Sequence, residues 1–187
     1  MSDHPRGGWD CSLATQDDLA EMDALRRSEQ EAVGFVPMSK WEWHIKHRPN
    51  TLITMRENGD MVGYIYWTAG LPVAAIQQLV IRSDARRFER GSALVAKAIK
   101  VMEHPARYGV TCRCRSDLEA ILFWPAIGFE IVREEQSGRR GPVLRFYKEL
   151  KPSLLPLGLY LPEKFKGGGQ RQGFRLIPAQ AIRRVYA

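Results

Sequence analysis

The segment that most constrains this chain is a strand-like run that ends in an arginine-rich turn and leads into a helix. It covers residues 79–95, LVIRSDARRFERGSALV. The turn holds Arg86, Arg87 and Arg90, and Gly91-Ser92 open the helix. The first N–H groups of a helix have no intrahelical partner, and the helix dipole is positive there, so small residues at this point let an anion approach. The segment therefore predicts a phosphate-binding turn. The alternative is an ordinary exposed helix start whose arginines lie in water.

The rest of the chain alternates strand-like and helical patterns. Strand patterns occupy residues 9–14, 51–56, 61–67, 73–81, 110–115, 129–135 and 143–150, and helical patterns occupy 16–29, 39–48, 86–104 and 117–127. Their order is β-α-α-β-β-β-α-β-α-β-β. We expect an α/β fold with one mixed, mostly antiparallel central sheet and helices on both faces.

Two local signals locate element boundaries. Thr15 and Asp18 have the spacing of a capping box at the start of the first helix. Asn58-Gly59 supplies the positive φ angles of a tight turn between two strand patterns, which predicts a β-hairpin.

The positive charge is concentrated near the C-terminus. The whole chain carries a net charge of +7. Residues 151–187 hold seven basic residues and one acid, a net charge of +6, which leaves +1 for residues 1–150. We expect one domain at 1–150 and a basic extension containing Pro and Gly at 151–187. A neutral body with a basic appendage favours a docking element over a nucleic-acid-binding face spread across the domain.

Two classes of protein are disfavoured by the sequence. A run of about 18 apolar residues would be needed for a membrane-spanning helix, and the chain contains none. The first residues lack the apolar stretch of a signal peptide. The three cysteines, Cys11, Cys112 and Cys114, indicate reduced thiols and hence a cytoplasmic protein rather than a disulfide framework.

Two motifs resemble those of the GNAT superfamily of N-acyltransferases that use acyl-coenzyme A. The coenzyme A motif of that family reads Q/R-x-x-G-x-G/A, and residues 86–91, RRFERG, occupy it here. A second family motif resembles N-x-x-A-x-x-F-Y-x-x-x-G-F. It is matched by Asp117, Ala120, Phe123, Trp124, Gly128 and Phe129. The resemblance extends over roughly residues 9–150.

The resemblance implies that acetyl-CoA is the acyl donor and that an amine is the acceptor. Backbone groups of Leu79, Val80 and Ile81 would pair with the pantetheine arm, and amides between Arg87 and Ser92 would hold the pyrophosphate. The implied cofactor-binding residues are Leu79, Val80, Ile81, Arg86, Arg87, Arg90, Gly91, Ser92, Asp117 and Phe123. The acceptor would enter near Phe35, Trp41 and His44.

Three residues depart from the family pattern. Glu89 replaces the first glycine of the coenzyme A motif, so its carboxylate must point away from the pyrophosphate or pair with Arg86 or Arg90. Trp124 replaces a tyrosine that protonates the leaving thiolate in many members, and an indole N–H is a very poor acid. Gln78, next to Gln77, lies where many members have a glutamate base; a glutamine can orient a water but cannot accept a proton.

The candidate catalytic residues are therefore Gln78, Asp117 and Trp124. His44, Glu42 or Asp117 could provide a base. For His44 we favour an ordinary surface histidine on a helix, and for Asp117 a helix cap. His44 and His47 have the i, i+3 spacing of two metal ligands, but without a third ligand we expect no metal. Cys112 and Cys114 fall on one face of a buried strand and are expected in the core.

The C-terminal extension allows several partners. Its leucines would be shielded from water by packing against this domain, a second copy or a protein partner. Its basic residues could contact nucleic acid, for which Arg183 and Arg184 are the residues to test. The sequence thus predicts an acetyl-CoA-dependent N-acyltransferase. The alternative is a GNAT-fold protein without catalysis that serves as a structural or binding subunit.

Overall fold

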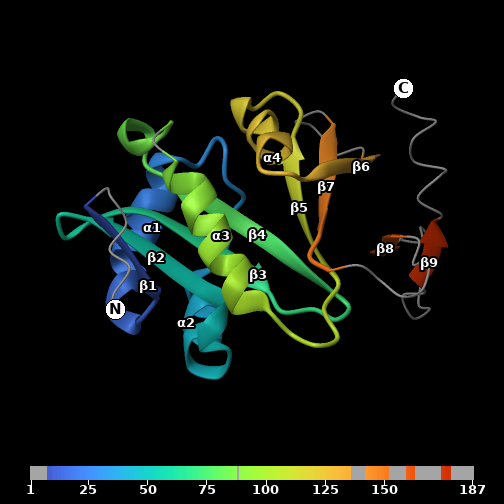
Figure 1. The fold of residues 1–187 in the computed structure, drawn as a ribbon. Helices are drawn as coiled ribbons and strands as arrows, with labels where there is room; N and C mark the ends of the chain where they lie inside the picture. The colour runs from blue at the N-terminus through green and yellow to red at the C-terminus, as the bar shows by residue number, and fades with distance from the viewer. Residues whose placement is uncertain (1–7, 88, 136–141, 152–158, 163–173, 178–187) are drawn as a thin grey trace. The chain divides into compact units, whose positions relative to one another are not determined.

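The computed structural model describes residues 8–87, 89–135, 142–151, 159–162 and 174–177 (Figure 1). They form two compact units. The first comprises the residues up to Arg107 together with Thr111–Arg113, and the second comprises Tyr108–Val110 and the residues from Cys114 onward. This division into two units does not test the domain boundary that we expect at residue 150, which stays a prediction.

The first unit is a sheet with helices on both faces. Its strands are β1 (Trp9–Leu13), β2 (Leu52–Glu57), β3 (Asp60–Thr68) and β4 (Val73–Ile81), with the middle of β5 (Gly109–Arg115). Its helices are α1 (Leu19–Ser28), α2 (Met38–His47) and α3 (Arg90–Met102), with short 3-10 turns η1 (Gln16–Asp18), η2 (Pro49–Thr51) and η3 (Ser83–Ala85). Figure 1 shows α3 crossing one face of the strands, while α1 and α2 lie on the other face.

Large buried side chains hold α1 and α2 against the sheet. Met22 of α1, Trp41 of α2, and Tyr64 and Tyr66 of β3 are all fully buried in one cluster. Burying such side chains is the dominant favourable contribution to folding. This cluster sets the positions of α1, α2 and the loop that joins them.

The second unit contains the ends of β5, the 3-10 turn η4 (Glu119–Ile121), α4 (Phe123–Ala126), and the antiparallel pair β6 (Glu130–Glu135) and β7 (Val143–Glu149). Gly128 ends α4 with a φ of 84°, a conformation that favours glycine. Two further strands, β8 (Leu159–Pro162) and β9 (Phe174–Ile177), pair antiparallel with each other.

The strand order of the main sheet is β1-β2-β3-β4-β5-β7-β6. The pairs β1–β2, β2–β3, β3–β4 and β6–β7 are antiparallel. The expected α/β fold and element order are confirmed. The hairpin is confirmed too, because Asn58 and Gly59 have φ angles of 52° and 90° between β2 and β3.

The capping box is confirmed at the first helix. The Thr15 N–H donates to the Asp18 carboxylate at 2.7 Å, and the Asp18 N–H donates to the Thr15 carbonyl oxygen at 3.3 Å. A 3-10 turn precedes α1, so the helix proper begins at Leu19 rather than Gln16. None of the helices in the described ranges is both long and apolar enough to cross a membrane.

Much of the C-terminal extension lies outside the described residues. This includes Arg183, Arg184, the glycine run at 167–169 and Leu154, Leu155 and Leu157. Within the extension, the structure describes Lys151 and the strands β8 and β9.

Candidate active site

The turn between β4 and α3 bends through two left-handed residues. Arg87 and Glu89 have φ angles of 67° and 60°, and Glu89 is the N-cap of α3. A non-glycine residue in this conformation is strained by about 1–3 kcal/mol. The helix expected from residue 86 therefore begins only at Arg90, because the left-handed residues cannot belong to a right-handed helix.

The first turn of α3 presents its backbone amides at this bend. The Ala93 N–H makes an intrahelical bond to the Glu89 carbonyl oxygen at 2.9 Å, and the Ser92 hydroxyl donates to the same oxygen at 2.7 Å. The preceding N–H groups of Arg90, Gly91 and Ser92 belong to the turn that lacks intrahelical partners. No acidic residue lies within the first turn itself. This end of α3 is suited to an anion, apart from the exposed Glu89 side chain beside it.

Two of the three arginines expected to bind phosphate already hold carboxylates. Arg86 pairs with Glu29, just after α1, and its Nε donates to the Ile81 carbonyl oxygen at 3.1 Å. Arg90 pairs with Glu57 at the end of β2, and its Nη1 donates to the Ala85 carbonyl oxygen at 3.2 Å. Neither of these ion pairs involves Glu89.

These ion pairs brace the turn against α1 and β2. Arg87 lies at the bend, and its side chain is exposed, as is that of Arg86. Nothing in the sequence pointed to Glu29 or Glu57, because each lies more than 30 residues from the arginine it pairs with. Only the packing of α1 and β2 beside the turn brings these charges together.

Residues 79–81 of β4 pair with β3. Leu79 lies opposite Ile65, Val80 opposite Tyr64 and Ile81 opposite Gly63. A Cβ at Gly63 would come within 2.8 Å of the Val80 carbonyl oxygen, so glycine is required for this close approach. The register shifts between Tyr66 and Trp67, whose partners are Gln78 and Ile76. Gln77 is thus the extra residue of a β-bulge and is exposed.

Gln78 is buried and bonded at both ends of its amide. Its Nε2 donates to the Gly34 carbonyl oxygen, and its Oε1 accepts from the Tyr64 hydroxyl at 3.1 Å. Burial raises the pKa of Tyr64, which keeps this hydroxyl protonated. Gln78 therefore ties β4 to the loop between α1 and α2. Its expected role in orienting a catalytic water stays a prediction.

His44 is buried, which corrects the expectation of a surface histidine; its exposed fraction is 8%. Its Nδ1 lies 2.8 Å from the Thr51 hydroxyl, and its Nε2 lies 2.9 Å from the Tyr66 hydroxyl. The Thr51 hydroxyl donates its own proton to the Arg48 carbonyl oxygen at 2.7 Å. Thr51 must then accept from an Nδ1–H of His44, and Nε2 accepts from Tyr66.

This chain of hydrogen bonds holds a neutral histidine. Burial lowers the pKa of His44, and the nearby cations of Lys40 and Arg48 lower it further. Burial also raises the pKa of Tyr66 to about 12, so Tyr66 remains a donor. Within the described residues no group of three or more His, Cys, Asp or Glu side chains could hold a metal ion, and His44 and His47 therefore belong to no such group.

The residues near the expected acceptor entry divide into exposed and buried. The Phe35 side chain is exposed, and the Arg26 guanidinium lies 5.0 Å from its ring centroid. Trp41 is fully buried and packs edge-to-face on Tyr64. Of these three residues Phe35 is the exposed one, and Trp41 and His44 are buried; the acceptor entry stays a prediction.

In the second unit, Asp117 binds Arg115 instead of capping a helix. Arg115 donates to the two carboxylate oxygens at 2.9 and 2.6 Å, and η4 begins after Leu118 without a side-chain cap. This corrects the expectation of a cap. The competing interpretations of Asp117 as a base and as a cofactor contact stay predictions.

Trp124 lies in the core of the second unit. Its ring packs against Phe123, Phe129 and Phe146, and it hydrogen-bonds Cys114, which is buried as expected. Phe123 is half-buried. The indole N–H is thus used inside the unit, and the expected part of Trp124 in catalysis stays a prediction.

Comparison with protein-family models matches residues 17–129 to the acetyltransferase (GNAT) family. The match covers more than half of the chain and includes both motifs up to Phe129. This chain belongs to the GNAT family.

Solved GNAT-fold structures agree with this assignment in fold. Ard1 from Thermoplasma volcanium is 16% identical with a TM-score of 0.69, covering 78% of this chain and 99% of that one. The ribosomal-protein-S18-alanine N-acetyltransferase from Escherichia coli is 18% identical with a TM-score of 0.62, covering 82% and 99%. The structure of yncA from Salmonella typhimurium with acetyl-CoA is 13% identical with a TM-score of 0.65, covering 80% and 98%. No curated protein sequence matches the chain.

The GNAT assignment relates the left-handed turn to the family's coenzyme A motif. The family motif has glycine where this chain has Glu89, and the φ of 60° at Glu89 shows why glycine suits the position. At this position the chain has a non-glycine residue, which is strained in that conformation.

Proposed function

We propose that this GNAT protein transfers an acetyl group from acetyl-CoA to a primary amine. The observation that carries the proposal is the bend at Arg87 and Glu89, which places the N-terminus of α3, with its amides that lack intrahelical partners, within the family's coenzyme A motif. Acetyl-CoA as the donor is further supported by the structure of yncA, which was solved with that molecule.

The donor's pyrophosphate would be held by backbone amides of Arg87, Arg90, Gly91 and Ser92. Arg87 is exposed at the bend and supplies a cation to the phosphates. Arg86 and Arg90 act mainly by holding the turn in shape through Glu29 and Glu57. Leu79, Val80 and Ile81 would offer backbone groups to the pantetheine arm, and Asp117 and Phe123 of the second family motif would contribute further contacts.

In the reaction the amine nitrogen attacks the thioester carbonyl carbon. A C–N bond forms, the C–S bond breaks, and coenzyme A leaves as a thiolate that takes up a proton. The amine must lose one proton over the same cycle. Gln78 and Trp124 cannot accept that proton, so we propose that the amine enters in its neutral form and that catalysis rests on positioning and carbonyl polarisation.

Calorimetric titration with acetyl-CoA tests the donor. We expect the full chain to bind, and Gly91→Asp to bind at least about tenfold more weakly, because a carboxylate would face the pyrophosphate. Aspartate is favourable in the first turn of a helix, so this variant should still fold. Lys97→Ala, on the exposed side of α3, is the matched control. Absence of binding by the unmodified chain at millimolar acetyl-CoA would overturn the proposal.

Turnover with a panel of amines tests the transfer step. Release of the coenzyme A thiol is followed with a thiol reagent, and the acetylated amine is identified by mass spectrometry. Binding without turnover on any amine would instead support the alternative of a non-catalytic subunit, which no comparison now supports.

Which partner the basic extension contacts is a separate question. We propose that any contact with nucleic acid through residues 151–187 is electrostatic, so binding should fall steeply as salt rises. Replacement of Arg183 and Arg184 with glutamine should abolish it. Binding that is indifferent to salt would count against an electrostatic contact.

A further inference from the structure

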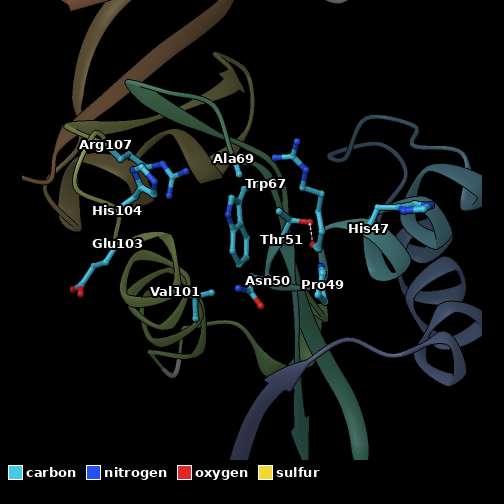
Figure 2. A pocket seen from close by; sticks show the side chains of 11 residues that line it. His47, Pro49, Asn50, Thr51, Trp67, Ala69, Val101, Glu103, His104 and Arg107 are labelled. Carbon is cyan, nitrogen blue, oxygen red and sulfur yellow. Dashed lines mark hydrogen bonds between the residues drawn. The ribbon is translucent and has the colours of Figure 1, made fainter.

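A cavity of about 350 Å³ lies in the first unit, beside the C-terminal end of α3 (Figure 2). Its wall is formed by the end of α3, the residues that follow α3, the turn η2 and the end of β3. The turn between β4 and α3, which we propose binds acetyl-CoA, lies at the opposite, N-terminal end of α3. The volume is within the range of small-ligand sites.

Arg107 contributes a buried positive charge to this cavity. Its exposed fraction is 8%. The Nε donates to the Gly70 carbonyl oxygen at 3.2 Å, and Nη1 donates to the Met102 carbonyl oxygen. A guanidinium has five N–H donors. The two carbonyl bonds therefore leave the Nη2 group available at the cavity.

No carboxylate balances this charge in the part of the chain that the structure describes. Arg107 forms no ion pair with any described residue. Glu103 is the acid among the lining residues, and Figure 2 shows its side chain extending away from Trp67. Burial lowers the pKa of Arg107, and no neighbouring carboxylate raises it again. A buried charge without a counter-charge is costly, so an anion in the cavity would be strongly favoured.

The rest of the lining indicates what kind of anion fits. His104 and Arg48 add further basic groups, and Asn50 adds an amide. The apolar lining includes Ala69 and Val101, which are partly exposed, with the fully buried Trp67 behind them. A bare inorganic anion would leave the exposed parts of Ala69 and Val101 in contact with water. A carboxylate attached to a small apolar body would fill both parts of the cavity.

We propose that this cavity binds a small organic carboxylate, whose oxygens contact Arg107 and whose apolar part lies over Ala69 and Val101, next to the buried Trp67. The site is separate from the acetyl-CoA turn and does not depend on the proposed acetyl transfer. The competing explanation is that Arg107 only caps α3, since cations at a helix C-terminus interact favourably with the last carbonyl groups.

The test uses benzoate as the probe on the full chain without acetyl-CoA. Chemical shifts of the tryptophan indole groups and thermal unfolding are followed at constant ionic strength. We expect saturable shifts and a raised Tm with benzoate and neither with neutral benzamide. Arg107→Gln should weaken benzoate binding by about tenfold or more, because it removes a charge-assisted hydrogen bond. Lys97→Ala, outside the cavity, should bind benzoate as the unmodified chain does.

A second variant keeps the proposal testable if Arg107→Gln fails to fold. Asn50→Asp changes no volume and places a competing carboxylate in the cavity, so it should weaken benzoate binding as well. Absence of any saturable effect of benzoate on the unmodified chain would leave Arg107 as a helix cap only and overturn the proposal. Inorganic phosphate binding as tightly as benzoate would overturn the assignment to an organic carboxylate.

Discussion

Arg90, the first residue of α3, pairs with Glu57, the last residue of β2. The pair joins the turn between β4 and α3 to a strand that is distant in sequence, and both side chains are largely removed from solvent. It therefore positions the turn in addition to any contact that Arg90 makes with a phosphate.

Replacing Glu57 with glutamine should lower the free energy of unfolding by about 1–3 kcal/mol, because the partly buried Arg90 loses its counter-charge. Urea unfolding measures this. The double variant Glu57→Gln with Arg90→Gln should be less destabilised than the sum of the two single variants. Additive effects would show that the two side chains do not interact.

Replacing Glu89 with glycine should both stabilise the chain and tighten acetyl-CoA binding. Relief of the left-handed strain at Glu89 is expected to outweigh the added freedom of the unfolded chain, with a net gain of about 0.5–2 kcal/mol. Removal of the carboxylate also lowers repulsion of the pyrophosphate. Glu89→Gln separates the effects, since it removes the charge and keeps the Cβ. Thermal unfolding and calorimetry provide the two measurements, and a destabilised Glu89→Gly would contradict the strain argument.

His44 should make the chain less stable in mild acid. The lowered pKa means that the folded state binds a proton less readily than the unfolded state, whose histidine has a pKa near 6.5. The stabilising contribution of the neutral His44 is therefore present above that pH and is lost as the pH falls below it. Urea unfolding between about pH 5 and 7.5 should show this slope in the unmodified chain. His44→Gln should reduce the slope, and an unchanged slope would assign it to other groups.

Replacing Gln78 with leucine should destabilise the chain by about 1–3 kcal/mol, because the buried Tyr64 hydroxyl and the Gly34 carbonyl lose their partner. Tyr64→Phe is the matched variant, and the combined loss should be smaller than the sum. A variant with normal stability and no turnover would favour the catalytic role over the structural one. Steady-state kinetics beside urea unfolding distinguishes the two.

Local patterns were sufficient to predict most elements of the fold. The Thr15–Asp18 box and the Asn58-Gly59 turn depend on residues a few positions apart, so their geometry follows from the sequence itself. The start of α3 was placed four residues early, since helical periodicity runs on through Arg86 and does not reveal the left-handed φ angles at Arg87 and Glu89.

The candidate site was predictable only in part. The motif at residues 86–91 located the turn, because the amides of a helix start and the nearby arginines are adjacent in sequence. The partners of those arginines were not predictable, since ion pairs form between whichever charges packing brings together. The same reason explains why His44, on a helix with exposed neighbours, gave no sign of its bonds to Thr51 and Tyr66.

The sequence by itself determined the order of strands and helices, the coenzyme motif and thereby the GNAT family, because each depends on residues close together in the chain. Tertiary structure alone decided which carboxylates pair with the arginines of that motif. The carboxylates of Glu29 and Glu57 hold Arg86 and Arg90, and both acids lie far from these arginines in the sequence. Long-range packing determines these partners, so they cannot be predicted from the residues next to the arginines in the sequence.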